Sequence, residues 1–377
     1  MNLKKNIFIA TIVATFLYTP LTIAETQKIN LSAIQKSANQ GDANAQFSLG
    51  YLYSQGEEVV QDYAKALEWY RKAADQGNNV AQLFLGISYA EGKGVPQDYI
   101  RAAEWYRKAA DQGNDVAQSL LGSIYFKGQG VPQDYTKALE WYRKTANQGN
   151  INAQFNLGMS YAEGQGVPQD YAKALEWYQK AADQGSAGAQ VNLGVLYANG
   201  QGTPKNYAKA LEWYLKAAEQ GSADAQTNLG RLYSKGQGVP QDYAKALEWY
   251  RKAAEQDNDS AQFNLALMYE NGQGVPKNYT QAAAWFRKAA DQGNVRAQFN
   301  LGMSYAEGQG VPKNYTQAAA WFRKAADQGD DNAQYNLATL YYRGLGVPKN
   351  INVAKQWYRK AAIQGNSEAK NFLDGLK

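Results

Sequence analysis

The chain has 377 residues with no cysteine and no histidine, and its 39 basic and 34 acidic residues give a net charge of +5. The missing residue types exclude disulfides, thiolate or imidazole metal ligands, and catalysis by a cysteine nucleophile or histidine base. The charge is small for this length, so we expect no nucleic-acid partner.

Residues 1–24 have the pattern of a secretory signal peptide. Two lysines precede an apolar run over residues 7–18, and small residues in Thr22-Ile23-Ala24 occupy the positions that a signal peptidase reads. The run of about 12 residues is shorter than the roughly 20 that span a bilayer, which leaves a retained anchor as the alternative. We predict cleavage before Glu25, a periplasmic or secreted protein, and no membrane span after cleavage.

A period of 36 residues governs the rest of the chain. It is marked by all nine tryptophans, which are Trp69, Trp105, Trp141, Trp177, Trp213, Trp249, Trp285, Trp321 and Trp357. Self-similarity at such a period predicts a solenoid, in which each unit buries its apolar face only against its neighbours. We therefore expect one elongated domain of nine repeats over residues 43–366. A capping helix within residues 25–42 and another within 367–377 would cover its ends.

Each repeat contains the boundary signals of two helices. In the first repeat, helix A begins after Asp42 and ends at Gly56, and helix B begins after Asp62 and ends at Gly77. Aspartate, asparagine or serine recurs before each helix and can cap its first amides, while glycine closes its last turn. The turn between the helices reads Gly-x-Gly-Val-Pro, as at residues 92–96, which is not a helical sequence. The predicted fold is therefore all-α.

The spacing of apolar residues predicts which helix faces meet. Apolar residues recur at intervals of three, four and seven, and large residues of helix B face small residues of helix A. Gly50 lies in the middle of helix A, where glycine costs about 1 kcal/mol relative to alanine. We expect this glycine and its equivalents to admit an aromatic ring of the neighbouring helix. Glu68 and Lys72 are spaced for an ion pair, which the first six repeats share.

The motif Leu49-Gly50-x-x-Tyr53, followed by Ala66-x-x-x-Tyr70, resembles the tetratricopeptide helix pair. That repeat has about 34 residues and carries its tryptophan on the first helix. The longer period, the tryptophan on helix B and the Gly-x-Gly-Val-Pro turn are instead similar to the Sel-one-like repeat (SLR) over residues 43–366. The resemblance implies a right-handed α/α superhelix that serves as a scaffold or adaptor for protein partners, in bacteria often exported.

Some repeats depart from the common pattern. Glu58 and Val60 replace the glycine and proline of the first turn, which makes that turn the least certain. Asp257 replaces a helix-ending glycine and Ala266 a mid-helix one, so we expect a different angle between the sixth and seventh repeats. Many exported relatives pair a cysteine in each repeat, and without cysteines this chain must be stabilised by packing alone.

A catalytic site is a single constellation, whereas the marked residues here recur in about nine copies. We therefore predict no catalytic residue, no cofactor and no metal site. Some relatives are linked to penicillin binding, so a penicillin-interacting hydrolase is one alternative. The sequence contains one Ser-x-x-Lys motif, Ser367 to Lys370, and its serine is expected near a helix start.

The candidate site lies on helix A, which lines the concave face of tetratricopeptide-like superhelices. The residue before the repeated leucine is an asparagine in six repeats: Asn156, Asn192, Asn228, Asn264, Asn300 and Asn336. In related domains this slot can hold an asparagine that clamps a peptide, because an amide both donates and accepts hydrogen bonds. The alternative is that each asparagine bonds within the stack. Three positions later the residue type varies, as a shaped groove would need and as drift on an unused surface would also produce. At that position Met159, Arg231 and Met303 are further candidates.

These observations predict a non-enzymatic, exported, monomeric scaffold that binds a protein or an extended peptide on its concave face. A second hypothesis is a cell-wall or glycan-binding module, which the 28 tyrosines would favour.

Overall fold

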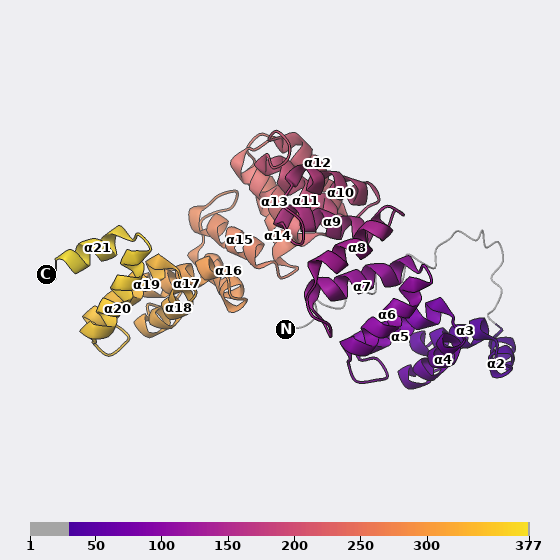
Figure 1. Ribbon diagram of the computed structural model, residues 1–377. Coiled ribbons are helices and arrows are strands. Elements are labelled where there is room, and N and C mark those ends of the chain that lie inside the picture. Colours follow the sequence, from indigo (N-terminus) through magenta and orange to yellow (C-terminus); the bar gives the residue numbers. More distant parts are fainter. Residues whose placement is uncertain (1–29, 376–377) are drawn as a thin grey trace. The chain divides into compact units, whose positions relative to one another are not determined.

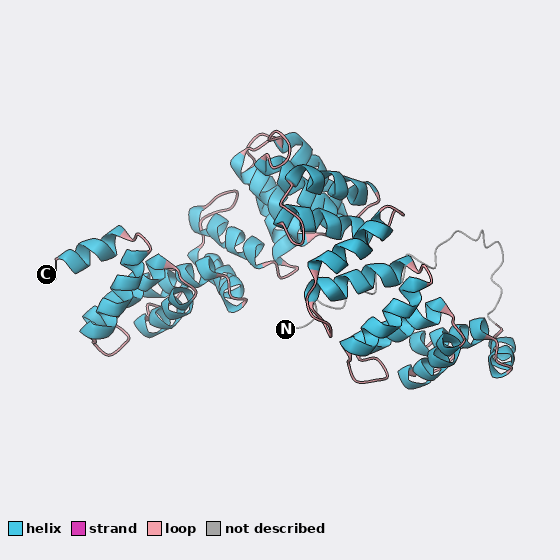
Figure 2. Ribbon diagram, in the orientation of Figure 1, coloured by secondary structure: helices cyan, strands magenta, loops and turns pink. Residues whose placement is uncertain are grey.

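The computed structural model describes residues 30–375 and shows only helices and loops there (Figure 2). The predicted signal peptide, the start of the N-terminal cap and the last two residues lie outside this range. Within it, no helix combines the length and the apolar character needed to cross a membrane. The all-α prediction is confirmed.

The helices follow the predicted order of two per repeat. The A helices are α3 (Ala43–Gln55), α5 (Asn79–Glu91), α7 (Asp115–Lys127), α9 (Ile151–Glu163), α11 (Ala187–Asn199), α13 (Ala223–Lys235), α15 (Asp259–Asn271), α17 (Val295–Glu307) and α19 (Asp331–Arg343). The B helices are α4 (Tyr63–Asp75), α6 (Tyr99–Asp111), α8 (Tyr135–Ala146), α10 (Tyr171–Asp183), α12 (Tyr207–Glu219), α14 (Tyr243–Ala254), α16 (Tyr279–Asp291), α18 (Tyr315–Asp327) and α20 (Ile351–Ile363). Helices α2 (Leu31–Asn39) and α21 (Ser367–Asp374) lie at the ends.

The described chain divides between Gln184 and Gly185 into two compact units. The first contains α2 to α10 and the second α11 to α21 (Figure 1). Within each unit the extensive helix contacts join helices that follow one another in the chain. This is the stacked helix-pair architecture of an α-solenoid, in which a repeat is stabilised by its neighbours.

The predicted caps form in every repeat. Asp42 Oδ1 accepts a hydrogen bond from the Ala45 amide at 2.6 Å, and Asp62 Oδ1 accepts one from the Lys65 amide at 3.0 Å. The bond from the Lys65 amide favours the carboxylate and lowers the pKa of Asp62. Gly56 closes helix α3 in a left-handed conformation with φ of 76°. The short loops are thus set by local capping chemistry.

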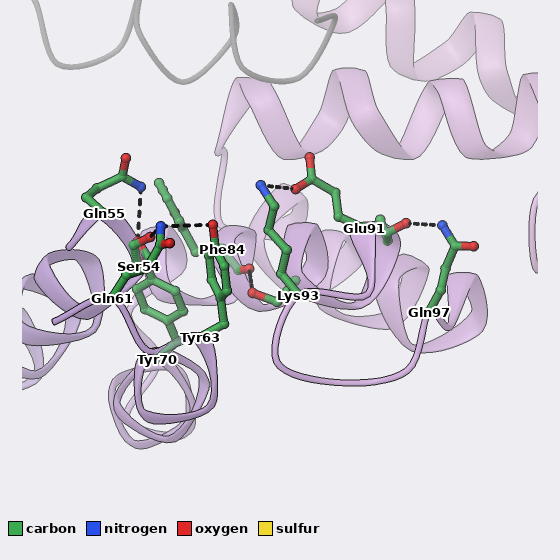
Figure 3. A network of polar contacts seen from close by, with 11 residues as sticks. Ser54, Gln55, Gln61, Tyr63, Tyr70, Phe84, Glu91, Lys93 and Gln97 are labelled. Carbon is green, nitrogen blue, oxygen red and sulfur yellow. Dashed lines mark hydrogen bonds and ion pairs between the residues drawn. The ribbon is translucent and has the colours of Figure 1, made fainter. Parts of the chain in front are cut away.

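The mid-helix glycines make room for aromatic rings, as predicted. A Cβ atom on Gly50 would lie 2.8 Å from Cδ1 of Tyr70, closer than atoms pack. The Tyr70 hydroxyl then donates to Ser54 Oγ at 3.1 Å, within the polar network of the first repeats (Figure 3). Ala266 and Ala338 occupy the equivalent place in two later repeats and are fully buried. The ring contact therefore fixes the spacing of helices A and B.

The two departures at glycine positions keep the glycine conformation. Asp257 has φ of 60° and Glu58 has φ of 59°, both in the left-handed region. The amide of Asn258 donates to the carbonyl of Ala253 at 3.2 Å, and the corresponding bond recurs in seven other repeats. The turn at Asp257 is therefore closed normally, and the different angle between these repeats stays a prediction.

The second glycine of the turn packs against the preceding repeat. A Cβ on Gly238 would lie 2.7 Å from Cβ of Tyr207, which begins the B helix of the preceding repeat. Glu58, which holds this position in the first repeat, is exposed.

The solvent face of helix B differs from the prediction. Among the described residues, the predicted Glu–Lys pairs form only at Glu212–Lys216 (2.9 Å) and Glu248–Lys252 (2.7 Å). In all nine repeats the lysine ammonium instead lies over the tryptophan three residues earlier, 3.8 to 5.5 Å from the ring centroid. A cation over an indole face competes well with an exposed ion pair, which contributes little.

Candidate functional site

Buried glutamines, and not the six candidate asparagines, bond between the stacked helices. In the seventh repeat, Gln262 Nε2 donates to the carbonyl of Ala254 at 3.1 Å, and Gln262 Oε1 accepts from Gln292 Nε2 at 2.8 Å. We call the buried residues at the Gln262 position the glutamine ladder: Gln46, Gln82, Gln118, Gln154, Gln190, Gln226, Gln262, Gln298 and Gln334. The sequence contained the signal, because glutamine occupies both positions in every repeat, but the prediction did not use it.

The six predicted asparagines are half-buried on the A helices. Asn264 and Asn336 donate to the carbonyls four residues earlier, at 2.8 and 2.9 Å. The other four side-chain amides have no hydrogen-bond partner among residues 30–375, and no asparagine of the six bonds to another repeat there. The six asparagines therefore do not connect the repeats, and four of their amides are available for a partner.

Five of these asparagines form a row within the second unit. Asn192, Asn228, Asn264, Asn300 and Asn336 hold the same position on α11, α13, α15, α17 and α19. Asn156 lies on α9 in the first unit. The residue before each asparagine is anchored in several repeats, since Phe263 contacts the ring of Phe286 with centroids 5.8 Å apart. The row is thus presented by a packed surface.

The three further candidates lie one turn along the same helices. Arg231 is exposed on α13, and Met159 and Met303 are half-buried. Burial raises the pKa of the Tyr214 hydroxyl to about 12, and the positive charge of Arg231 opposes part of that rise. Met303 packs against the cluster that contains Phe322. The variable position therefore supplies one exposed cation beside the asparagine row.

The residues behind the alternative hypotheses occupy structural positions. The tyrosines at the centre of the B helices are buried, which removes their faces from sugar stacking: Tyr70, Tyr106, Tyr142, Tyr178, Tyr214, Tyr250 and Tyr358. Ser367 is the first residue of α21, as predicted, and its hydroxyl lies 3.0 Å from Glu368 Oε2.

Stacked helix pairs with a row of amides on the A helices define a tetratricopeptide-like α-solenoid. The family model of the Sel1 repeat matches nine consecutive segments of the chain: residues 43–78, 79–114, 115–150, 151–186, 187–222, 223–258, 259–294, 295–330 and 331–366. The chain belongs to the Sel1 repeat family, as its resemblance to Sel-one-like repeats predicted. Proteins of this family are generally scaffolds for protein interactions and typically have no catalytic activity.

Solved structures support the assignment. A protective antigen present in uropathogenic Escherichia coli strains, with an SLR fold, is 37% identical; the match covers 93% of this chain and 91% of that one, with a TM-score of 0.57. A Sel1 repeat protein from Oxalobacter formigenes is 36% identical over 86% of this chain and 98% of its own, with a TM-score of 0.65.

A curated relative matches over a shorter stretch. The secretory immunoglobulin A-binding protein EsiB of Escherichia coli is 40% identical over 69 residues. That match spans 18% of this chain and 14% of EsiB.

Proposed function

We propose that this protein is an exported, monomeric scaffold that binds an extended segment of a protein partner along its A helices, without chemistry of its own. The observation that carries the proposal is the row of asparagines at one position of five successive A helices. An extended backbone offers N–H and C=O groups in alternation, and amide side chains can pair with both. Membership of a family of interaction scaffolds supports the same function.

Export rests on the pattern of residues 1–24, with basic residues, a short apolar run and small residues before Glu25. The test is expression in a Gram-negative host, followed by fractionation and determination of the N-terminal residue of the mature chain. We expect Glu25 at the N-terminus of protein recovered from the periplasm or medium. A chain that keeps Met1 and stays with the membrane would contradict the proposal.

Peptide binding can be tested without knowing the partner. Peptides selected from a random display library on the purified mature protein would be measured against the triple variant N192A/N228A/N264A. Loss of a few hydrogen bonds of about 1 kcal/mol each should weaken binding on the order of tenfold or more. The A-helix substitutions should leave the helical content unchanged, because these side chains make no bonds to other repeats.

The matched control is K209A/K245A/Q281A, which removes exposed side chains from the B helices of three repeats. It should bind the selected peptides as the unmodified protein does. Equal losses in both triple variants, or no loss in the asparagine variant, would contradict binding along the A helices.

A further inference from the structure

The first unit contains a cavity of about 230 Å³ at the joint of the third and fourth repeats. Asp115, Val116, Ser119 and Leu120 of α7 form one wall, and Gln148 and Ile151 contribute from the turn between α8 and α9 and from the start of α9. Leu120 holds the position on α7 that Asn156 holds on α9 of the next repeat, so the cavity lies at the candidate position of the A helices of the first unit.

Two residues of the third repeat differ from all of their equivalents, and one of them, Ser119, lines the cavity. Ser119 is the smallest residue at a position that is Phe155, Phe263 or Phe299 in other repeats. Thr145 replaces an alanine of the B helix, and its hydroxyl bonds back to the carbonyl of Trp141 at 3.1 Å.

The polar groups beside this cavity lack the partners that their equivalents have. Gln118 is fully buried, and its Oε1 atom has no hydrogen-bond partner among the described residues. In other repeats that atom accepts from a glutamine thirty residues later, as Gln154 does from Gln184 at 2.7 Å. The corresponding Gln148 lines the cavity instead. Ser119 is 7% exposed, and its hydroxyl also has no bonded partner within residues 30–375.

The lining is suited to a cation with an aliphatic stem. Asp115 is its one ionisable residue, and Asn150 Nδ2 reaches only one of its oxygens, Oδ2, at 3.4 Å. Val116, Leu120 and Ile151 supply apolar surface. The oxygens of Asp115, Ser119 and Gln148 can all accept hydrogen bonds.

We propose that this cavity receives an arginine side chain of the bound partner, which the proposed peptide-binding function would bring to the A helices. A guanidinium donates five hydrogen bonds in a plane, carries its charge on a methylene stem and pairs well with a carboxylate. A lysine would offer only a point charge to the several acceptors. The cavity thus adds a side-chain anchor on an A helix to a function that otherwise recognises backbone.

The probe is N-acetyl-arginine methylamide, with the neutral isostere N-acetyl-citrulline methylamide as its comparison, and binding is followed by ligand-observed NMR. We expect the arginine compound to bind roughly tenfold more tightly, because the isostere lacks the charge that Asp115 meets. S119F fills the cavity with the side chain of sister repeats, and D115N removes the charge. Each should weaken arginine binding roughly tenfold.

Two matched variants control for general effects. T227F introduces the same ring at the equivalent position of the sixth repeat, and D259N neutralises an aspartate whose Asn294 contact resembles that of Asp115. Both should leave binding unchanged. Equal binding of the two compounds, or unchanged binding in both S119F and D115N, would overturn the cavity proposal.

The outcomes separate this proposal from the one on which it rests. If selected peptides still bind through the asparagines while S119F and D115N have no effect, the arginine anchor is wrong and the scaffold function stands. If the arginine compound binds at the cavity but no peptide binds the A helices, the scaffold function is wrong and the cavity is a separate site.

Discussion

At the scale of single residues, the turns that close the B helices impose a left-handed backbone whatever residue occupies them. Gly221 has φ of 85°, and a Cβ there would have no neighbouring atom within 4 Å. Asp257 adopts φ of 60° at the same place one repeat later. The difference between the two residues is therefore almost purely one of backbone conformation.

This gives a paired stability prediction. G221D should lower the free energy of unfolding by about 1 kcal/mol, because the left-handed region costs a non-glycine residue more than it restricts the unfolded chain. D257G should raise it by about 0.5 kcal/mol, less because Asp257 Oδ1 accepts from Gln262 Nε2 at 3.4 Å. Urea unfolding followed by circular dichroism measures both. Changes of the same sign in the two variants would contradict the argument.

The caps, the turn glycines and the glycine–ring contacts could be predicted because each depends on residues within one repeat. Gly50 predicted a contact with an aromatic ring of helix B, because a glycine in the middle of a helix needs a compensating contact. The position of Gln148 could not be predicted, because its repeat carries the same pair of glutamines as the others and the missing bond is a tertiary property. Whether the asparagines bind was also beyond the sequence, since partners of side chains are a tertiary property.

At the scale of helices, the glutamine ladder is the main polar connection. The ladder residues are buried. Most of them donate to the preceding helix B, and all except Gln118 accept from a glutamine of their own repeat, as Gln262 does from Gln292. An unpaired buried amide oxygen costs about 1 to 3 kcal/mol, so the second glutamine is important although it is exposed.

Two alanine substitutions test whether this bond stabilises the protein, one that removes it and one that serves as the control. Q292A leaves the Gln262 oxygen unpaired and should lower the free energy of unfolding by about 1 kcal/mol or more. Q148A removes a side chain that makes no such bond and should change it by less than about 0.5 kcal/mol. Hydrogen exchange at the ends of α8 and α16 would localise the effect. Equal losses of unfolding free energy in the two variants would show that the bond between Gln292 and Gln262 does not stabilise the protein.

The B-helix surface shows where spacing arguments fail. Glu68 and Lys72 have ideal spacing for an ion pair, yet Lys72 lies 3.9 Å from the ring centroid of Trp69. Both arrangements are compatible with the sequence and differ by a few tenths of a kcal/mol. Choices of that size depend on the local environment of each ring.

At the scale of the molecule, stacking by nearest neighbours predicts tolerance to a change in repeat number. Residues 278–293 and 314–329 are identical, so deletion of one repeat presents the ninth repeat with the same B helix that it already contacts. Stability in such arrays is close to a sum of repeat and interface contributions.

Deletion of residues 295–330 should therefore give a folded protein. We expect unchanged helical content per residue and a smaller urea m-value, since less surface is exposed on unfolding. The control is deletion of residues 295–312, which removes one helix and half a period and should disrupt the stack. A full-period deletion that aggregates or loses helicity would argue for long-range contacts that the helix pairs do not show.

The fold class and all nine repeat boundaries followed from the sequence because periodicity constrains every repeat at once. The features in which one repeat differs from the others were the least predictable. They are the cavity at Ser119, the missing bond at Gln118 and the left-handed turns at Glu58 and Asp257. Each is a place where one repeat differs from its copies.

The break in the glutamine ladder at Gln118 has a mechanical consequence. A load applied along the chain passes from helix to helix through these amide bonds, and the third repeat must carry it with one bond fewer. Stretching should therefore unfold the first unit at that joint. A side chain bound beside Gln148 would raise the force needed to unfold it.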